Sequence, residues 1–226
     1  MKGESDVSHN QTQVRISFHV HVCWSIHRPS ISKRCCSSLI PASHGEKTTR
    51  QAYHDEWRKL WEDHITWTRV VIIGILDELP GTDVYIARLL QNYEYMKEVL
   101  APYYGDDAEV LGDLIQDHLV IAAEILTATN NGDTAAMNDA IERWYANAHD
   151  IAVQMNEMNP KSWPLEETEQ MWVEHLDATL AEATTHLTGD FEGEVAAYDL
   201  VHDLALEMAD FFSNGVIKQF PSRFTG

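Results

Sequence analysis

From Arg50 onward, regularly placed turn signals divide the sequence into six stretches with helical periodicity. The signals are Pro80-Gly81, Pro102 with Gly105, Asn131-Gly132, Asn159-Pro160 and Gly189. The helices are expected at about 50–79, 82–100, 106–130, 133–158, 165–189 and 190–214. No alternating strand pattern competes, and short connections favour antiparallel neighbours. We therefore predict an all-α fold, either an up-down bundle of about six helices in three hairpins or a four-helix core with an added hairpin.

A short phrase recurs in three of these stretches, each time an acidic residue, a histidine and an aliphatic residue. Its copies are Asp63-His64-Ile65, Asp117-His118-Leu119 and Glu174-His175-Leu176. In the second and third copies a Gly-Asp pair follows the histidine at the same interval, at Gly132-Asp133 and Gly189-Asp190. Two interpretations stay open: a true internal repeat of one helical hairpin, or independent use of ordinary helix-end residues.

Charge is divided unevenly along the chain. Residues 1–50 hold 7 Lys/Arg and 3 Asp/Glu, a net charge of +4, whereas residues 51–226 hold 9 Lys/Arg and 33 Asp/Glu, a net charge of −24. Nucleic acid and anionic membranes are not expected partners, because both bind clustered cations. The acidity fits either solubility through self-repulsion or adaptation to high salt. Without a transmembrane run or a clear secretory signal, a cytoplasmic protein is expected, and a homo-oligomer stays open.

Residues 1–48 differ from the rest of the chain, because they are rich in serine and net basic. They hold all three cysteines and several histidines, among them Cys23, Cys35, Cys36, His19, His21, His27 and His44. We predict a disordered or accessory tail over residues 1–48 and a single helical-bundle domain over residues 49–226. The alternative is a metal-binding appendage, although the spacing matches no standard zinc finger.

Four histidines lie on apolar stripes of the predicted helices and should face the interior: His64, His118, His175 and His202. His175 precedes Gly189 by nearly the same interval by which His202 follows it. At a rise of ~1.5 Å per residue both would be ~20 Å from the same turn and level with each other. The sequence thus predicts a polar layer across the bundle. Further polar residues that could join it are Glu94, Tyr145, Asn147, Glu182 and Asp199.

Such a layer would suit a metal, since neutral imidazoles on facing helices are good transition-metal ligands. The candidate ligands are His64, His118, His175, His202, Glu182 and Asp199. The cofactor would be a zinc or iron ion, or a haem held between two histidines. The alternative is a non-enzymatic structural or interaction bundle, whose core histidines are satisfied by acids or carbonyl groups. A third hypothesis, a hydrolytic metalloenzyme, needs an open coordination position beside a general base, so enzymatic activity stays open.

Several phrases resemble a family of small bacterial and archaeal proteins of unknown function. They are Trp61 to Arg69, Arg143 to Asn147, Met155 to Pro160 and Gly215 to Pro221. The resemblance covers about residues 52–224 and none of the preceding tail. It implies a helical bundle and a dispensable N-terminal segment, and it assigns no functional residue.

Overall fold

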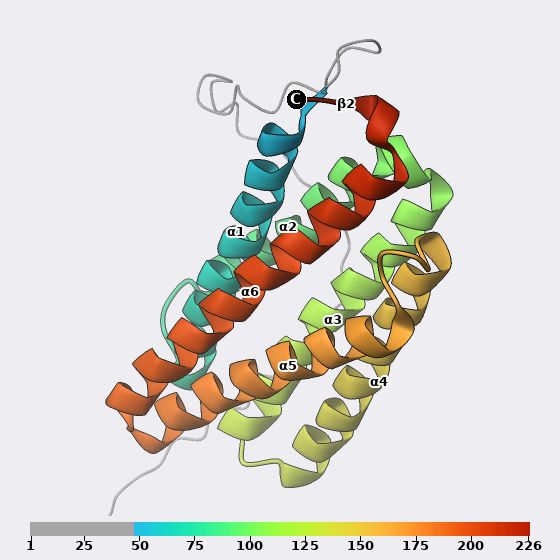
Figure 1. The fold of residues 1–226 in the computed structure, drawn as a ribbon. Coiled ribbons are helices and arrows are strands. Elements are labelled where there is room, and N and C mark those ends of the chain that lie inside the picture. The colour runs from blue at the N-terminus through green and yellow to red at the C-terminus, as the bar shows by residue number, and fades with distance from the viewer. Residues whose placement is uncertain (1–47) are drawn as a thin grey trace, which may run out of the picture. The chain divides into compact units, whose positions relative to one another are not determined.

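Six long helices account for nearly all of residues 48–226, which are the residues that the computed structural model describes (Figure 1). This confirms the all-α prediction. The helices are α1 (Arg50–Leu76), α2 (Thr82–Tyr104), α3 (Asp106–Asn130), α4 (Thr134–Met158), α5 (Leu165–Thr188) and α6 (Phe191–Gln219). The predictions made for residues 1–47, an accessory tail or a metal-binding appendage, lie outside the described residues.

The helices pack in the order in which they occur in the chain, each against the one before and the one after. The last helix, α6, also packs against α1, so the neighbours form a closed ring, while α1 reaches across to α3 and α5. Two short strands, β1 (Thr48–Thr49) and β2 (Phe224–Thr225), form a parallel pair. β1 directly precedes α1, and β2 follows α6 and the 3₁₀ helix η1 (Pro221–Arg223), so the pair links the first helix to the end of the last one. Because α1 contacts so many helices, its side chains lie at the centre of the site described below.

Three of the six helices, α1, α4 and α6, begin with a side-chain cap, whereas α2, α3 and α5 begin without one. The hydroxyl of Thr49 accepts a hydrogen bond from the Ala52 N–H, and the carboxylates of Asp133 and Asp190 accept from Ala136 and Gly193 in the same way. Each cap satisfies one of the N–H groups that a helix start leaves free, which stabilises the helix by ~1 kcal/mol. The α3–α4 and α5–α6 turns, two of the three hairpin turns, are thus stabilised by hydrogen bonds between residues next to the turn.

Two helices run further than the sequence predicts. Pro102 lies inside α2, which continues to Tyr104, so this proline does not end the helix. The second difference is at Gly215, which lies inside α6 instead of ending it. A Cβ atom there would collide with Nε1 of Trp163, so the glycine makes room for an indole. This close approach, and not a turn, explains the residue.

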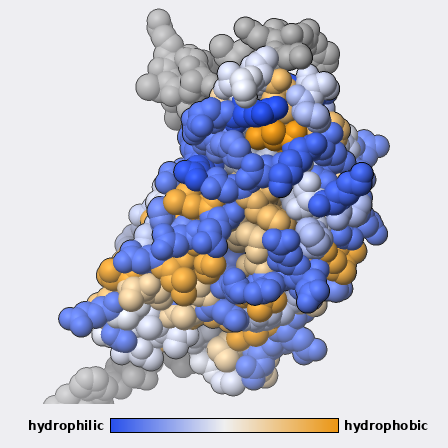
Figure 2. Space-filling model, in the orientation of Figure 1, coloured by the Kyte–Doolittle hydropathy of each residue, from blue (hydrophilic) through white to orange (hydrophobic). Residues whose placement is uncertain are grey.

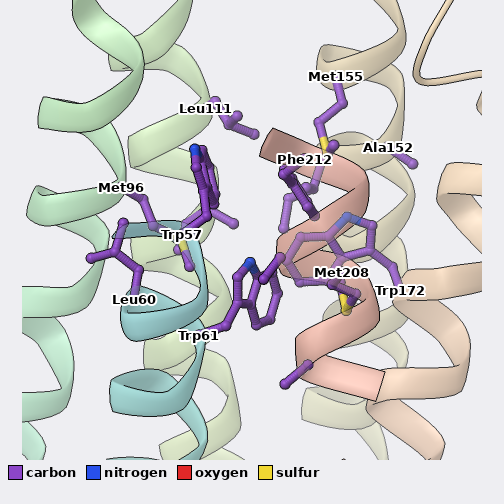
Figure 3. Packing of buried hydrophobic residues seen from close by; sticks show 14 of the residues in the cluster. Trp57, Leu60, Trp61, Met96, Leu111, Ala152, Met155, Trp172, Met208 and Phe212 are labelled. Atoms are coloured by element: carbon purple, nitrogen blue, oxygen red, sulfur yellow. The ribbon is translucent and has the colours of Figure 1, made fainter. Parts of the chain in front are cut away.

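Aromatic side chains fill the middle of the bundle (Figure 3). The ring of Trp57 stacks on that of Phe212 at a centroid distance of 5.4 Å, joining α1 to α6. The face of the molecule seen in Figure 2 is mostly hydrophilic, with apolar side chains between the hydrophilic ones. No helix among residues 48–226 combines the length and the apolar character that crossing a bilayer would require.

Candidate functional site

The three histidines of the recurring phrase meet in the core, so three of the four histidines expected on inward-facing stripes do face the interior. His64 comes from α1, His118 from α3 and His175 from α5, and each is buried. The ring centroids of His64 and His175 are 5.5 Å apart. We call these three residues the imidazole cluster.

Tryptophan rings enclose the imidazole cluster. Trp61 packs edge-on against His64 and His175 at centroid distances of 5.3 and 5.7 Å. Trp172 packs against His118 and His175 at 5.3 and 6.2 Å. Trp144 completes the shell by stacking on His118 at 5.0 Å. The imidazoles therefore lie in a site from which water is largely excluded.

The orientation of His118 is fixed by one asparagine. Asn147 on α4 donates from Nδ2 to the carbonyl oxygen of Leu114 at 3.0 Å, which turns its Oδ1 toward the histidine. His118 Nδ1 lies 3.1 Å from that oxygen, and because an amide oxygen only accepts, Nδ1 carries the proton. The lone pair of His118 is therefore on Nε2.

The first hairpin repeats part of this arrangement. Asn92 on α2 donates from Nδ2 to the carbonyl oxygen of Leu60 at 2.9 Å. Leu60 lies four residues before His64, just as Leu114 lies four residues before His118. The Asn92 Oδ1 atom has no hydrogen-bond partner, however, and neither has His64 Nδ1. The same holds for Nδ1 of His175, whose hairpin contributes no such asparagine contact among the described residues.

Burial keeps the imidazole cluster uncharged. Desolvation lowers the pKa of His64 to about 4, and the neighbouring amide of Asn92, which stands close to the ring without meeting hydrogen-bond geometry, opposes the shift. Desolvation, and then repulsion from His64, lowers the pKa of His118 to about 3. The pKa of His175 is lowered well below its usual value by burial and by both other histidines. At neutral pH all three rings are therefore neutral, which is the form that binds metals.

Two predicted members of the layer lie elsewhere. The side chain of His202 is 38% exposed and faces Glu62 at 3.7 Å, so it does not face His175 inside the bundle. Asp199 is exposed. The expected inward stripe of α6 was placed one residue off, because the buried positions are Val201, Ala205 and Met208. A one-residue shift turns a helical side chain by ~100°, from the interior toward the surface.

Glu182 is buried, as expected, but it belongs to a different group of side chains. Two turns beyond His175 on α5, it accepts a hydrogen bond from Arg69 Nη1 at 2.8 Å. The other end of the Arg69 guanidinium donates to Glu194 on α6 at 2.7 Å. His186 Nδ1 lies 3.0 Å from Glu194 and its Nε2 lies 3.3 Å from Asp77. We call Arg69, Asp77, Glu182, His186 and Glu194 the charged cluster.

Titration in the charged cluster follows pairing as well as burial. Burial raises the pKa of Glu182 to about 7, against the opposing effect of Arg69. Burial alone would lower the pKa of His186, but the hydrogen bonds to Glu194 and Asp77 outweigh it and raise that pKa above its usual value. Because both ring nitrogens of His186 face carboxylates, the bound form is the imidazolium.

The other predicted members of the layer have partners of their own. Tyr145 donates to Asp177 on α5, and Glu94 pairs with Lys97 at 3.2 Å near the surface. Among residues 48–226, no group of three or more His, Cys, Asp or Glu side chains is arranged so that it could hold a metal ion as it stands. The imidazole cluster is therefore a gathering of potential ligands and not a finished coordination sphere.

Several residues of the site were missed by the sequence analysis. Asn92 follows His64 at almost the same interval at which Asn147 follows His118, so the matching interval was a usable signal. The first and third hairpins also share Trp-x-x-His-x-x-x-Thr, in which Thr68 and Thr179 each donate to the carbonyl oxygen of the histidine at 2.8 Å. No sequence pattern marked Arg69 as a site residue, because its partners Glu182 and Glu194 lie on helices that are distant in the sequence.

Comparison with known proteins adds no assignment. No protein-family model, curated protein or solved structure matches this chain. The geometry of the two clusters therefore carries the functional argument.

Proposed function

We propose that the helical bundle binds a transition-metal ion through His64, His118 and His175. The observation that carries this proposal is that three neutral imidazoles from three helices share one buried site, and that Nδ1 of both His64 and His175 has no hydrogen-bond partner. A buried polar atom without a partner costs ~1–3 kcal/mol, so it is rarely retained without a reason. A shared cation would satisfy both nitrogens at once.

The ring separation is compatible with a shared ion. With metal–nitrogen bonds of ~2 Å, two imidazoles on one zinc ion have ring centres ~5 Å apart. The centroids of His64 and His175 are 5.5 Å apart. His118 would bind through Nε2, because its Nδ1–H is held by Asn147, the arrangement in which metal-bound histidines are usually oriented.

A bare ion suits the site better than a haem. The indoles of Trp61 and Trp172 pack directly on the imidazoles at 5.3–6.2 Å, where a porphyrin would need open space. Three nitrogen ligands without a thiolate favour zinc, copper, nickel or iron. No carboxylate belongs to the cluster, so a divalent ion would bind a hydroxide or another small anion in the fourth position.

Binding requires two of the three rings to turn. His118 is held in place by Asn147, whereas His64 and His175 are free at Nδ1 and lose no Nδ1 hydrogen bond when they rotate. His118 would therefore be the fixed ligand toward which the other two adjust. The proposal accordingly predicts small side-chain rearrangements of α1 and α5 on binding and no change in the fold.

Metal titration of protein prepared without a histidine tag and freed of metal by chelator tests the proposal. We expect one Zn²⁺ or Co²⁺ per chain, with cobalt giving the visible absorption of a low-coordinate nitrogen site. Singly substituted His64→Ala, His118→Ala and His175→Ala should each weaken binding at least ~10-fold. His202→Ala is the matched control, because its side chain lies at the surface, and should bind as the unchanged protein does.

A second candidate is a structural bundle in which the histidines are only core residues. It is favoured by the satisfied state of His118 and by the absence of a formed coordination group among residues 48–226. The same titration decides between them. Failure to bind stoichiometric metal, or equal binding by His202→Ala and all three core variants, would overturn the metal proposal and leave the structural bundle as the remaining candidate.

A further inference from the structure

The α1–α2, α3–α4 and α5–α6 turns lie at one end of the bundle, opposite the β1–β2 pair (Figure 1). Side-chain contacts show that these turns are neighbours. His186 Nε2, beside the α5–α6 turn, lies 3.3 Å from Asp77, and Asn130 donates to Glu78 at 3.4 Å. Residues 130–134, which form the α3–α4 turn, are exposed and carry no large apolar side chain. This is the usual composition of a turn at the surface.

The other two turns expose apolar side chains. These are Leu79 (41% exposed), Val84 (68%), Leu187 (51%), Phe191 (64%) and Val195 (54%). Five of the nine large apolar side chains exposed in the described part of the chain thus lie beside two neighbouring turns. Single exposed apolar side chains are ordinary, whereas a group of them marks an interaction surface. We call these five residues the apolar end.

The surroundings of the apolar end are negatively charged. Residues 70–87 and 162–217, which include the two turns, contain no Lys or Arg. Exposed carboxylates accompany the apolar side chains, at Asp83 in the first turn of α2 and at Glu192 in the first turn of α6. Arg69, the first cation before the α1–α2 turn, is held between two carboxylates of the charged cluster. The apolar end therefore offers carboxylates to a partner and no free guanidinium or ammonium of these segments.

This combination of apolar and acidic side chains decides which partner fits. A second copy of the chain would bring the same carboxylates against each other, and an anionic bilayer would repel them. A segment with apolar side chains on one face and Lys or Arg beside them would bury the apolar end and pair with its carboxylates in the same contact. The apolar contact supplies most of the affinity, and the charges set orientation and association rate.

We propose that the apolar end is a docking surface for a basic amphipathic segment of another protein. Phe191 and Val195 are four residues apart on α6 and therefore lie on one face of the helix, where both can contact the apolar face of the segment. Asp83 and Glu192 pair with its cations. The imidazole cluster is buried inside the bundle, so docking does not depend on metal binding.

Two fluorescein-labelled peptides of leucine and lysine test the proposal on full-length, metal-free protein. In the first, the leucines recur at helical spacing on one face, and in the second the same residues are shuffled so that no apolar face forms. Fluorescence anisotropy should show binding of the first peptide that weakens as the NaCl concentration rises, and at least ~10-fold weaker binding of the second. Equal affinity for the two peptides would overturn the proposal, because charge alone would then explain the binding.

Substitutions locate the apolar contact. Phe191→Ser combined with Val195→Ser should weaken binding of the first peptide ~10–100-fold, since two apolar side chains are no longer buried. The matched control is Val110→Ser combined with Val120→Ser, two exposed apolar residues on α3, and it should bind as the unchanged protein does. Undiminished binding after the α6 substitutions, or an equal loss in both variants, would refute docking at the apolar end.

Charge reversals at the two ends of the bundle locate the ionic contact. Asp83→Lys combined with Glu192→Lys should weaken peptide binding at least ~10-fold. Glu98→Lys combined with Glu157→Lys makes the same change of net charge near the opposite end and should have a much smaller effect. Equal effects of the two reversals would mean that the peptide responds only to net charge, which would contradict the proposal.

Two measurements on the unchanged protein keep the test decisive if a variant does not fold. In ¹H–¹⁵N correlation spectra the first peptide should shift the signals of Leu187 and Val195 and leave those of Glu98 and Glu157 in place. The opposite pattern would overturn the proposal. Sedimentation should show a monomer, because a dimer that dissociates in Phe191→Ser would assign this surface to a second copy. Binding to anionic vesicles through the apolar end would likewise exclude a basic partner.

Discussion

His175 and His186 lie about three turns apart on the same helix, yet they are held in opposite charge states. His175 faces tryptophans and other histidines, so burial lowers its pKa and keeps the ring neutral. His186 faces Glu194 and Asp77, whose hydrogen bonds raise its pKa and hold the ring as an imidazolium. The partner, and not burial alone, sets the chemistry of a histidine in this bundle.

The two clusters respond to pH in opposite directions. Histidines of the imidazole cluster take up protons more readily in the unfolded chain, so acidification below pH 6.5 favours unfolding. Glu182 and His186 bind protons more tightly in the folded protein, so their contributions to stability weaken as pH rises through their folded pKa values. Substitutions in each cluster can therefore be distinguished by the sign of their pH dependence.

The largest effect is expected at Arg69, which joins α1 to α5 and α6. Arg69→Met leaves the buried carboxylates of Glu182 and Glu194 without their guanidinium, which should cost about 3–5 kcal/mol of unfolding free energy at pH 7. Urea denaturation measures the change. The matched control is Arg143→Met, whose exposed pairs with Glu124 and Asp139 should be worth under ~1 kcal/mol. Equal losses of unfolding free energy in the two variants would mean that the charged cluster does not stabilise the packing of α1 against α5 and α6.

The next effect is acid sensitivity of the imidazole cluster. Between pH 6.5 and 4, the unfolding free energy of metal-free protein should fall by up to ~1.4 kcal/mol per pH unit for each buried histidine. His175→Leu removes one of the protons and should flatten the slope by about a third of the imidazole contribution. Urea denaturation at half-unit pH steps gives this slope. A slope unaffected by the substitution would show that His175 is not held neutral in the fold.

An effect of opposite sign, from one group instead of three, is expected at a single carboxyl group. Because burial raises the pKa of Glu182 to about 7, this group destabilises the fold progressively as pH rises from 4.5 to 7, by at most ~1.4 kcal/mol per unit. Glu182→Gln should remove that dependence and so gain stability relative to the unchanged protein on going from pH 4.5 to 7. A gap between the two proteins that stays constant with pH would contradict the raised pKa.

Helix positions were predictable because turn residues mark them locally. Counting from the turns placed each of His64, His118 and His175 near the middle of its own hairpin, since a regular rise along each helix converts sequence intervals into distance, and the shared layer followed from the assumption that the hairpins stack in register. It failed for His202, where apolar residues on neighbouring faces of α6 made the inward stripe ambiguous by one position. Val195, which lies seven residues before His202 and therefore on the same predicted stripe, is 54% exposed.

The partners of these side chains were less predictable than their heights. Glu182 was expected inside the bundle and is buried, but what it contacts depends on Arg69, which comes from a helix far away in the sequence. The sequence analysis ended the last helix just before Gly215. The reason for a glycine there, the space that it leaves for Trp163, depends on the packing of α6 against the connection between α4 and α5 and cannot be read from the sequence. Helical periodicity describes one helix at a time, whereas these contacts depend on how several helices pack together.

The pairing of β1 with β2 has a consequence for how the chain could be rearranged. α6 packs against α1, and the strands β1 and β2 beside them are hydrogen-bonded. Each of the six helices therefore has a packed neighbour on both sides, including the first and the last in the chain. A circular permutant that joins residue 226 to residue 48 through a short linker, and opens instead at the exposed turn around Gly132, would retain every helix-to-helix interface. The order of synthesis and the order of packing are in this sense independent.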